Sequence, residues 1–180
     1  MNHHHHSRWT WRRLIACLCA LAGTVGAAPL HAAMDDYTLK DERARVGTSI
    51  VRTRATGPLP FDKTWSELDA AQRAAARAPY RGMPASDEPP FPAAGLAPMA
   101  RILVEGLWRM LADGDLRLRV QVDANGRAGN VDIIDCPAGK AGAEFAAGVV
   151  TLTPFKPAVC DGRPCGGSFL LELVVAVWRD

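Results

Sequence analysis

An alternating run followed by a tight-turn sequence is the feature that most limits how this chain can fold. Over Asp115–Val122 apolar and polar residues alternate, so one side of an extended strand faces a core and the other faces solvent. Asn125 and Gly126 then supply the positive φ angles of a tight turn, and Ala128–Ile134 returns as a second strand. The sequence therefore predicts a half-buried antiparallel hairpin.

Two helices and a long apolar strand accompany this hairpin. Pro98–Leu111 carries apolar residues at three- and four-residue spacing, with Pro98 suited to the first turn of a helix. Ala141–Leu152 has the same pattern, and Ser168–Trp178 is a nearly continuous run of Leu, Val and Phe. The order helix, strand, strand, helix, strand predicts an α+β domain over residues 93–180, with a small three-stranded antiparallel sheet packed against two helices.

Residues 34–92 are expected to form an N-terminal arm, a short helix and a connector ahead of this domain. Met34–Pro60 lacks a clear period and predicts a mostly extended arm. Thr64 and Glu67 form a capping box, which predicts a short helix over Trp65–Ala78 whose tryptophan docks on the domain.

A proline-rich connector follows this helix. Pro79–Pro98 holds six of the thirteen prolines, which favours extended, polyproline-like backbone. Two interpretations remain: a stiff strap laid over the domain with Phe91 tucked in, or a recognition segment for a partner.

Residues 1–33 have the pattern of a secretory signal peptide. A basic Arg12-Arg13 pair precedes the apolar run Leu14–Val25 and a region of small residues, with cleavage expected after Ala32 or Ala33. The alternative is an uncleaved inner-membrane anchor, although the apolar stretch falls short of the roughly 20 residues that span a bilayer. A lipoprotein box ending at Cys17 is a further alternative. We therefore expect export to the periplasm, with membrane contact only if the leader stays attached.

Charge and histidine content narrow the function classes. Three of the 21 basic residues and none of the 19 acidic ones precede Met34, so the remaining chain is close to neutral. That balance argues against a nucleic-acid partner. All five histidines also precede Met34, so removal of the leader would exclude Ser-His or Cys-His catalysis and histidine-bound zinc.

The remaining acidic residues are not arranged like a catalytic pair. Asp87 and Glu88 sit next to prolines and fit a solvated turn, whereas Asp132 and Asp135 fit the polar side of a strand. A phosphate-binding glycine loop and a cysteine metal cluster are absent from the sequence. We therefore expect a chain that is not an enzyme, with no catalytic residue, metal, cofactor or small-molecule substrate.

Three cysteines lie beyond the leader. Cys160 and Cys165 bracket the turn-forming sequence Asp161–Pro164, and in an oxidising compartment they are expected to form a disulfide. Cys136 is expected to stay unpaired, as a small buried apolar residue rather than a reactive thiol.

Two blocks of sequence carry a family resemblance. The first is the strand before Asn125-Gly126 and its return. The second and more specific one is Phe155–Ala158, a Phe-x-Pro-Ala block, followed closely by the Asp-Gly-x-Pro of Asp161–Pro164. Over Asp115–Trp178 the chain resembles the C-terminal domain of TonB-type energy transducers, and TolA-like C-terminal domains share the broad architecture. The transducers' Ser-x-x-x-His motif is missing from Leu14–Leu30, so the resemblance implies the binding module without the motor connection.

The resemblance implies a protein-binding adaptor of TonB-dependent transport, which grips a segment of an outer-membrane receptor by adding it as a strand. The terminal strand is the candidate edge, with its neighbouring face packed on the helices. The expected partner-binding residues are Leu170, Glu172, Val174, Ala176 and Trp178. The other possibilities are that this strand is central or covered by the strap, and that the chain is a TolA-like scaffold of the cell envelope unrelated to receptor import.

Overall fold

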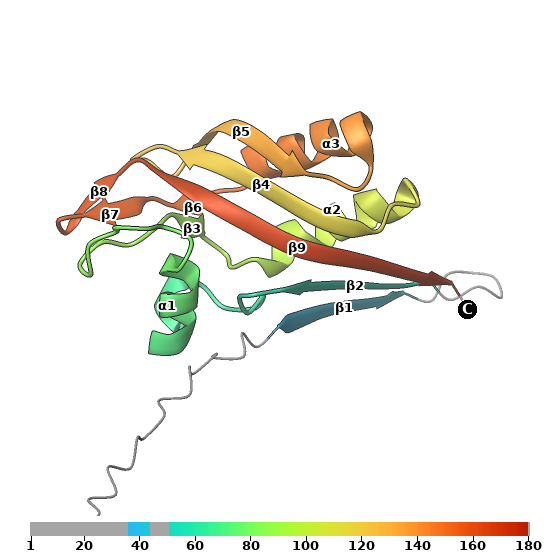
Figure 1. The fold of residues 1–180 in the computed structure, drawn as a ribbon, viewed down its shortest axis with the longest axis horizontal. Helices are drawn as coiled ribbons and strands as arrows, with labels where there is room; N and C mark the ends of the chain where they lie inside the picture. The colour runs from blue at the N-terminus through green and yellow to red at the C-terminus, as the bar shows by residue number, and fades with distance from the viewer. Residues whose placement is uncertain (1–35, 44–50, 180) are drawn as a thin grey trace, which may run out of the picture. The chain divides into compact units, whose positions relative to one another are not determined.

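An antiparallel sheet of five strands organises the chain (Figure 1). The computed structural model describes residues 36–43 and 51–179, so the expected signal peptide lies outside the described residues. The strands are β1 (Tyr37–Arg43), β2 (Val51–Gly57), β3 (Phe91–Pro92), β4 (Gly114–Val122), β5 (Ala128–Asp135), β6 (Phe155–Lys156), β7 (Ala158–Cys160), β8 (Arg163–Cys165) and β9 (Gly167–Arg179). The helices are the 3-10 turn η1 (Trp65–Glu67), α1 (Ala70–Arg77), α2 (Ala97–Arg109) and α3 (Gly139–Thr151).

The sheet is larger than the expected three strands. Its order is β1-β2-β9-β4-β5, so the predicted hairpin and terminal strand form one side and two further strands extend the other. Those two strands come from the segment that was expected to be an arm outside the domain. The sheet therefore draws strands from both sides of the boundary expected at residue 93.

Side-chain alternation decides which face of the sheet is covered. On β4 and β9 every second residue is buried, and α2 and α3 supply the side chains that pack against them. These buried strand residues are Leu116, Leu118, Val120, Val122, Phe169, Leu171, Leu173 and Val175. The α+β class is thus confirmed, with α2 and α3 on one face of the sheet.

The short helix differs from its predicted form. The capping box of Thr64 and Glu67 is present, but it starts only the 3-10 turn η1. Asp69 and Gln72 form a second capping box, and α1 begins there as a separate helix. Trp65 is buried, as the docking interpretation predicts. A second polar cap within the predicted helix thus interrupts it.

The proline-rich segment lies against the domain as a strap. Phe91 is fully buried beside Trp65 and Phe169, with ring centroids 5.9 and 6.1 Å away. β3 pairs with β6, which joins the end of the strap to the block containing Phe155. Pro89 and Pro90 are also buried, so this half of the strap belongs to the core.

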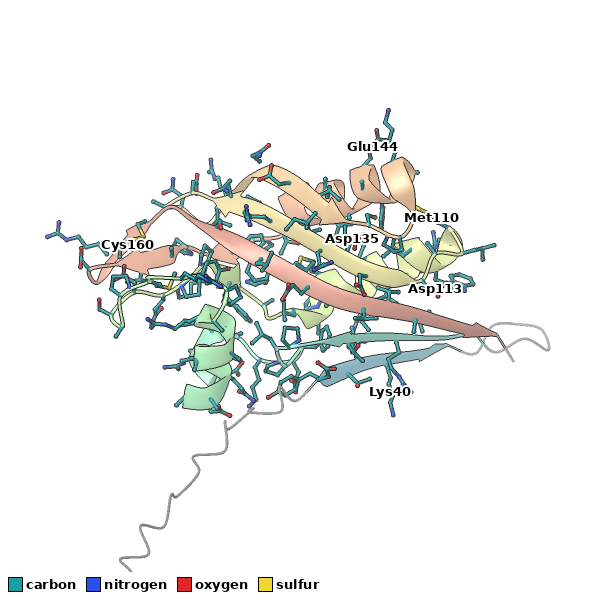
Figure 2. The ribbon with its side chains drawn as sticks, viewed as in Figure 1. Lys40, Met110, Asp113, Asp135, Glu144 and Cys160 are labelled. Atoms are coloured by element: carbon teal, nitrogen blue, oxygen red, sulfur yellow. A yellow bond between two sulfur atoms is a disulfide. The ribbon has the colours of Figure 1, made fainter. Side chains whose placement is uncertain are left out.

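A disulfide links Cys160 to Cys165 across the β7–β8 hairpin, as predicted, with the two Cα atoms 5.9 Å apart. Figure 2 shows Cys160 at the outer end of this hairpin. Cys136 is a free, partly buried thiol. Within the described residues, no helix is both long and apolar enough to cross a bilayer.

Candidate binding edge on the terminal strand

The expectation that β9 is an open edge is wrong for its C-terminal half. β2 pairs antiparallel with Val174–Arg179, so Val174, Ala176 and Trp178 lie opposite a strand of the same chain. β4 pairs with Gly167–Val175 on the other side. The reason is that the segment before residue 60, which was expected to be an arm, supplies β2, and β2 pairs with β9.

Leu170 and Glu172 lie where the cover by β2 has ended. The β2–β9 register stops at Thr56 opposite Val174, and extending it by two residues places Pro58 opposite Glu172. Proline has no backbone N–H and cannot continue a ladder. In the described part of the chain, no strand pairs with this side of β9 before Val174.

The backbone direction of β9 at this point follows from one hydrogen bond. The N–H of Leu170 donates to the hydroxyl of Tyr80 at 3.0 Å, so it points away from β4. Because backbone groups alternate sides along a strand, the N–H and carbonyl of Glu172 face the same way. This stretch of β9, from Leu170 to Glu172, lies before the described pairing with β2 begins and is called the binding edge below.

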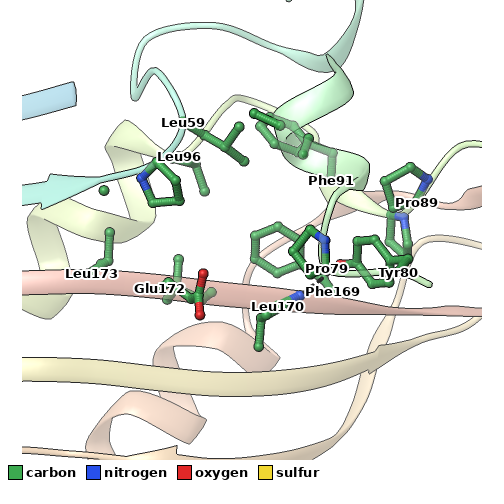
Figure 3. Close-up of a pocket in the computed structure, with 16 residues that line it drawn as sticks. Leu59, Pro79, Tyr80, Pro89, Phe91, Leu96, Phe169, Leu170, Glu172 and Leu173 are labelled. Carbon is green, nitrogen blue, oxygen red and sulfur yellow. Dashed lines mark hydrogen bonds between the residues drawn. The ribbon is translucent and has the colours of Figure 1, made fainter. Parts of the chain in front are cut away.

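An apolar groove runs along the binding edge (Figure 3). Its walls come from the end of β2, from α1 and the residues after it, and from the buried half of the strap. Labelled wall residues include Leu59, Pro79, Tyr80, Pro89, Phe91 and Leu96. The free cavity volume is only ≈ 30 Å³, which leaves room for no more than a few water molecules. The groove is therefore nearly closed in this structure.

Tyr80 is positioned by the end of α1. Its N–H donates to the carbonyl of Arg77 at 2.9 Å, which continues the helix by one turn. The Arg77 guanidinium donates to the carbonyls of Pro84 and Ala85 and holds the following loop back against the helix. Burial raises the pKa of the Tyr80 hydroxyl, and the hydrogen bond from Leu170 opposes that rise. Tyr80 is therefore held in place as a neutral phenol.

The far end of the strap is fastened to the disulfide hairpin. Glu88 and Val159 exchange two backbone hydrogen bonds of 2.9 Å. The Glu88 carboxylate also pairs with Lys156 at 2.9 Å, and the same ammonium lies 5.3 Å from the Trp65 ring centroid. Partial burial acts to raise the pKa of Glu88, yet the pKa is lowered because Lys156 favours the carboxylate. The strap is thus firmly held from Glu88 onward.

The outer strand β5 is protected against pairing with another strand by charged residues and bulges. Asn130, Asp132 and Asp135 are exposed along it, and its pairing with β4 contains two register irregularities. Charged residues and bulges are the usual means of blocking unwanted strand pairing. The binding edge has an apolar groove instead, which makes it the better candidate for a pairing partner.

The acidic residues singled out from the sequence have structural partners. Asp87 accepts a hydrogen bond from the N–H of Asp161, and Glu88 pairs with Lys156. Asp132 accepts from the side chain of Asn130, and Asp135 lies 3.5 Å from Arg117. Within the described residues, His, Cys, Asp and Glu form no group of three that could hold a metal ion.

A second apolar groove lies on the helix side, between the start of α2 and the end of α3. Ile102 and Leu152 line it and are 53% and 86% exposed, although both are large apolar residues. Met99, Val149 and three prolines also line it. Unlike the groove on β9, this one is open.

Leu170 and Glu172, which the sequence predicts to bind a partner, lie on the part of β9 that precedes its pairing with β2, and sequence reasoning missed Tyr80 and Pro58 beside them. The available signals were the Gly57-Pro58 pair, which stops a strand, and a tyrosine directly after Pro79. Comparisons with family models, curated proteins and solved structures give no match.

Proposed function

We propose that this chain is a protein-binding module of the periplasm, an adaptor of TonB-dependent transport that takes an extended segment of a partner along the binding edge. The observation that carries the proposal is the Leu170 N–H, which belongs to a central strand yet is bonded to a side chain rather than to a strand. A partner backbone placed there gains ladder hydrogen bonds, and its alternate side chains meet the apolar groove.

Contact between the two blocks of the family resemblance supports this reading. The carbonyl of Gly126, in the hairpin turn, accepts a hydrogen bond from the N–H of Phe155 at 3.0 Å. Phe155 in turn packs on Phe169 at the start of β9, with ring centroids 5.4 Å apart. The residues quoted for the resemblance thus form one structural unit that positions the binding edge.

Two substitutions at Glu172 test the proposal. Glu172→Pro removes a backbone N–H that faces the groove, whereas Glu172→Ala removes the same carboxylate and keeps the N–H. Synthetic peptides copied from the periplasm-facing segments of TonB-dependent receptors are titrated by calorimetry. We expect Glu172→Pro to weaken binding at least about fivefold and Glu172→Ala to bind nearly as wild type, because only the first loses a ladder hydrogen bond.

Circular dichroism and urea unfolding establish that both variants remain folded. Equal binding by the two variants would show that the backbone of Glu172 is not used. Absence of any binding by wild type, across a panel of such peptides, would reject receptor recognition.

A TolA-like scaffold unrelated to receptor import is the second candidate, favoured by the open groove between α2 and α3. Leu152→Ser makes that groove polar without touching the binding edge. If envelope proteins captured by the wild-type chain are lost with Leu152→Ser and kept with Glu172→Pro, the scaffold is the better account.

A further inference from the structure

We infer that Tyr80 is an intramolecular plug of the binding edge, whose hydroxyl occupies the position that a partner's backbone carbonyl takes when the partner binds. This inference rests on the proposed function and concerns its regulation. The chain then exists in a closed form, as seen here, and an open form in which Tyr80 has left the groove.

The first argument is the identity of the bonded atoms. Leu170 and Tyr80 are 90 residues apart in the sequence, and the bond joins a strand N–H to a phenol oxygen at 3.0 Å. A strand N–H that is partly buried needs an acceptor, and here a side chain supplies it before the β2 ladder begins. Any strand added at Leu170 must therefore replace the Tyr80 hydroxyl.

The second argument is space. The groove beside the binding edge is lined by Tyr80 and Pro79 and retains a free volume of only ≈ 30 Å³. An apolar side chain needs more room than a few water molecules. Binding therefore requires the wall that carries Tyr80 to move. A partner and the Tyr80 side chain cannot occupy the groove at the same time.

The third argument is that this wall is lightly held. Among the eight described residues of α1, Ala76 alone is buried. After Tyr80, Arg81 and Gly82 are exposed, as is the run from Pro84 to Ser86. Segments with few buried apolar contacts open at low free energy. α1 and the loop after it are thus suited to move together.

The fourth argument is that both ends of this moving unit are fixed. On one side, Trp65 and Leu68 are buried in the core. On the other side, Glu88 is bonded to Val159 of the disulfide hairpin, and Phe91 is fully buried. Opening can therefore displace the unit that carries Tyr80 without unfolding the sheet.

The test compares two tyrosine-to-phenylalanine variants of the full chain. Tyr80→Phe keeps the ring in the groove and deletes the hydroxyl. Tyr37→Phe is the matched control, because the Tyr37 hydroxyl also bonds to the α1 region, accepting from Gln72 at 3.0 Å, but Tyr37 belongs to β1, which does not pair with β9. Amide exchange of Leu170 is followed by NMR, and the affinity of the receptor peptide is measured by calorimetry.

We expect Tyr80→Phe to speed exchange of the Leu170 amide about fivefold and to raise peptide affinity by a similar factor, the value of a typical net hydrogen bond. Tyr37→Phe removes one bond to α1 but keeps the Tyr80 hydroxyl at Leu170, so it should change both quantities less than Tyr80→Phe does. Unchanged exchange in Tyr80→Phe would overturn the plug. Peptide binding by wild type with no gain in Tyr80→Phe would also overturn it while leaving the proposed function standing, whereas no binding by any of the three proteins rejects both.

Discussion

Gly126, in the β4–β5 turn, contacts the block that contains Phe155, so a substitution there tests how the hairpin and that block hold each other in place. Its φ is 79°, a region that costs residues with a Cβ about 1–2 kcal/mol. A Cβ at this position would also overlap the carbonyl oxygen of Phe155. The Gly126→Ala variant therefore meets two separate penalties.

The second penalty follows from the hydrogen bond at the same place. To relieve the overlap, Phe155 must move back, which breaks the 3.0 Å bond from its N–H to the Gly126 carbonyl. A lost backbone bond costs about 1 kcal/mol, and more if Phe155, now buried, shifts out of the core. We therefore expect Gly126→Ala to lower the free energy of unfolding by about 2–3 kcal/mol.

Gly162 supplies the matched control. Its φ is 76°, nearly the same, but a Cβ there would meet nothing within 4 Å. Gly162→Ala should cost only about 1–2 kcal/mol in urea unfolding. The difference between the two variants isolates the contact with Phe155. If they destabilise the chain equally, that contact contributes nothing and the reasoning fails.

Three further predictions address the disulfide, the cover of β9 and the plug. Replacing Cys160 and Cys165 by Ser should lower the free energy of unfolding by about 2 kcal/mol in urea, because the bridge closes a short loop; no change would contradict this. Val174→Pro should speed amide exchange in β2 and leave β4 protected, whereas equal loss in both strands would refute the inferred backbone direction. In a Tyr37→Phe background, ultraviolet titration should place the pKa of Tyr80 above its ordinary value of about 10. The unfolded chain loses the Tyr80 proton at a lower pH than the folded chain, so the free energy of unfolding should fall as the pH rises above about 10. A pKa at or below 10 would contradict the burial of Tyr80.

The parts of the fold that the sequence predicts are those with a strong period or a strong turn signal. β4 and β5 follow from alternation and the Asn125-Gly126 pair, and α2 and α3 begin within two residues of their predicted starts. The disulfide follows from the turn that Cys160 and Cys165 bracket. In each case the signal is local, so tertiary context does not alter it.

β1 and β2 could not be recognised because they have too little apolar pattern. Leu39 and Ala55 are the buried residues among those whose side chains are described in these strands. Each strand has one buried apolar side chain among those described, which is too few to show an alternating pattern, and the strands form because β9 offers a long ladder on which to pair. This is a case where a neighbour, rather than the segment itself, determines a strand.

Only the part of the candidate site that has a local sequence pattern could be predicted. Leu170 and Glu172 follow from the phase of the terminal strand, which is readable from its apolar face. Two features of the site depend on contacts between residues far apart in the sequence. They are the pairing of β2 with β9 from Val174 onward and the hydrogen bond between Tyr80 and Leu170. Neither spacing nor composition carries that information.

The two covers of β9 differ in strength, and the difference determines where a partner can act. β2 is paired with β9 over six consecutive positions, from Val51 opposite Arg179 to Thr56 opposite Val174, so displacing it breaks a ladder. Tyr80 covers the binding edge with one side-chain hydrogen bond, worth about 1 kcal/mol net. A partner strand therefore has fewer hydrogen bonds to break at Leu170 than at Val174. Binding should begin at Leu170, and it should stop at Glu172, which lies opposite Pro58, unless the partner also unpairs β2.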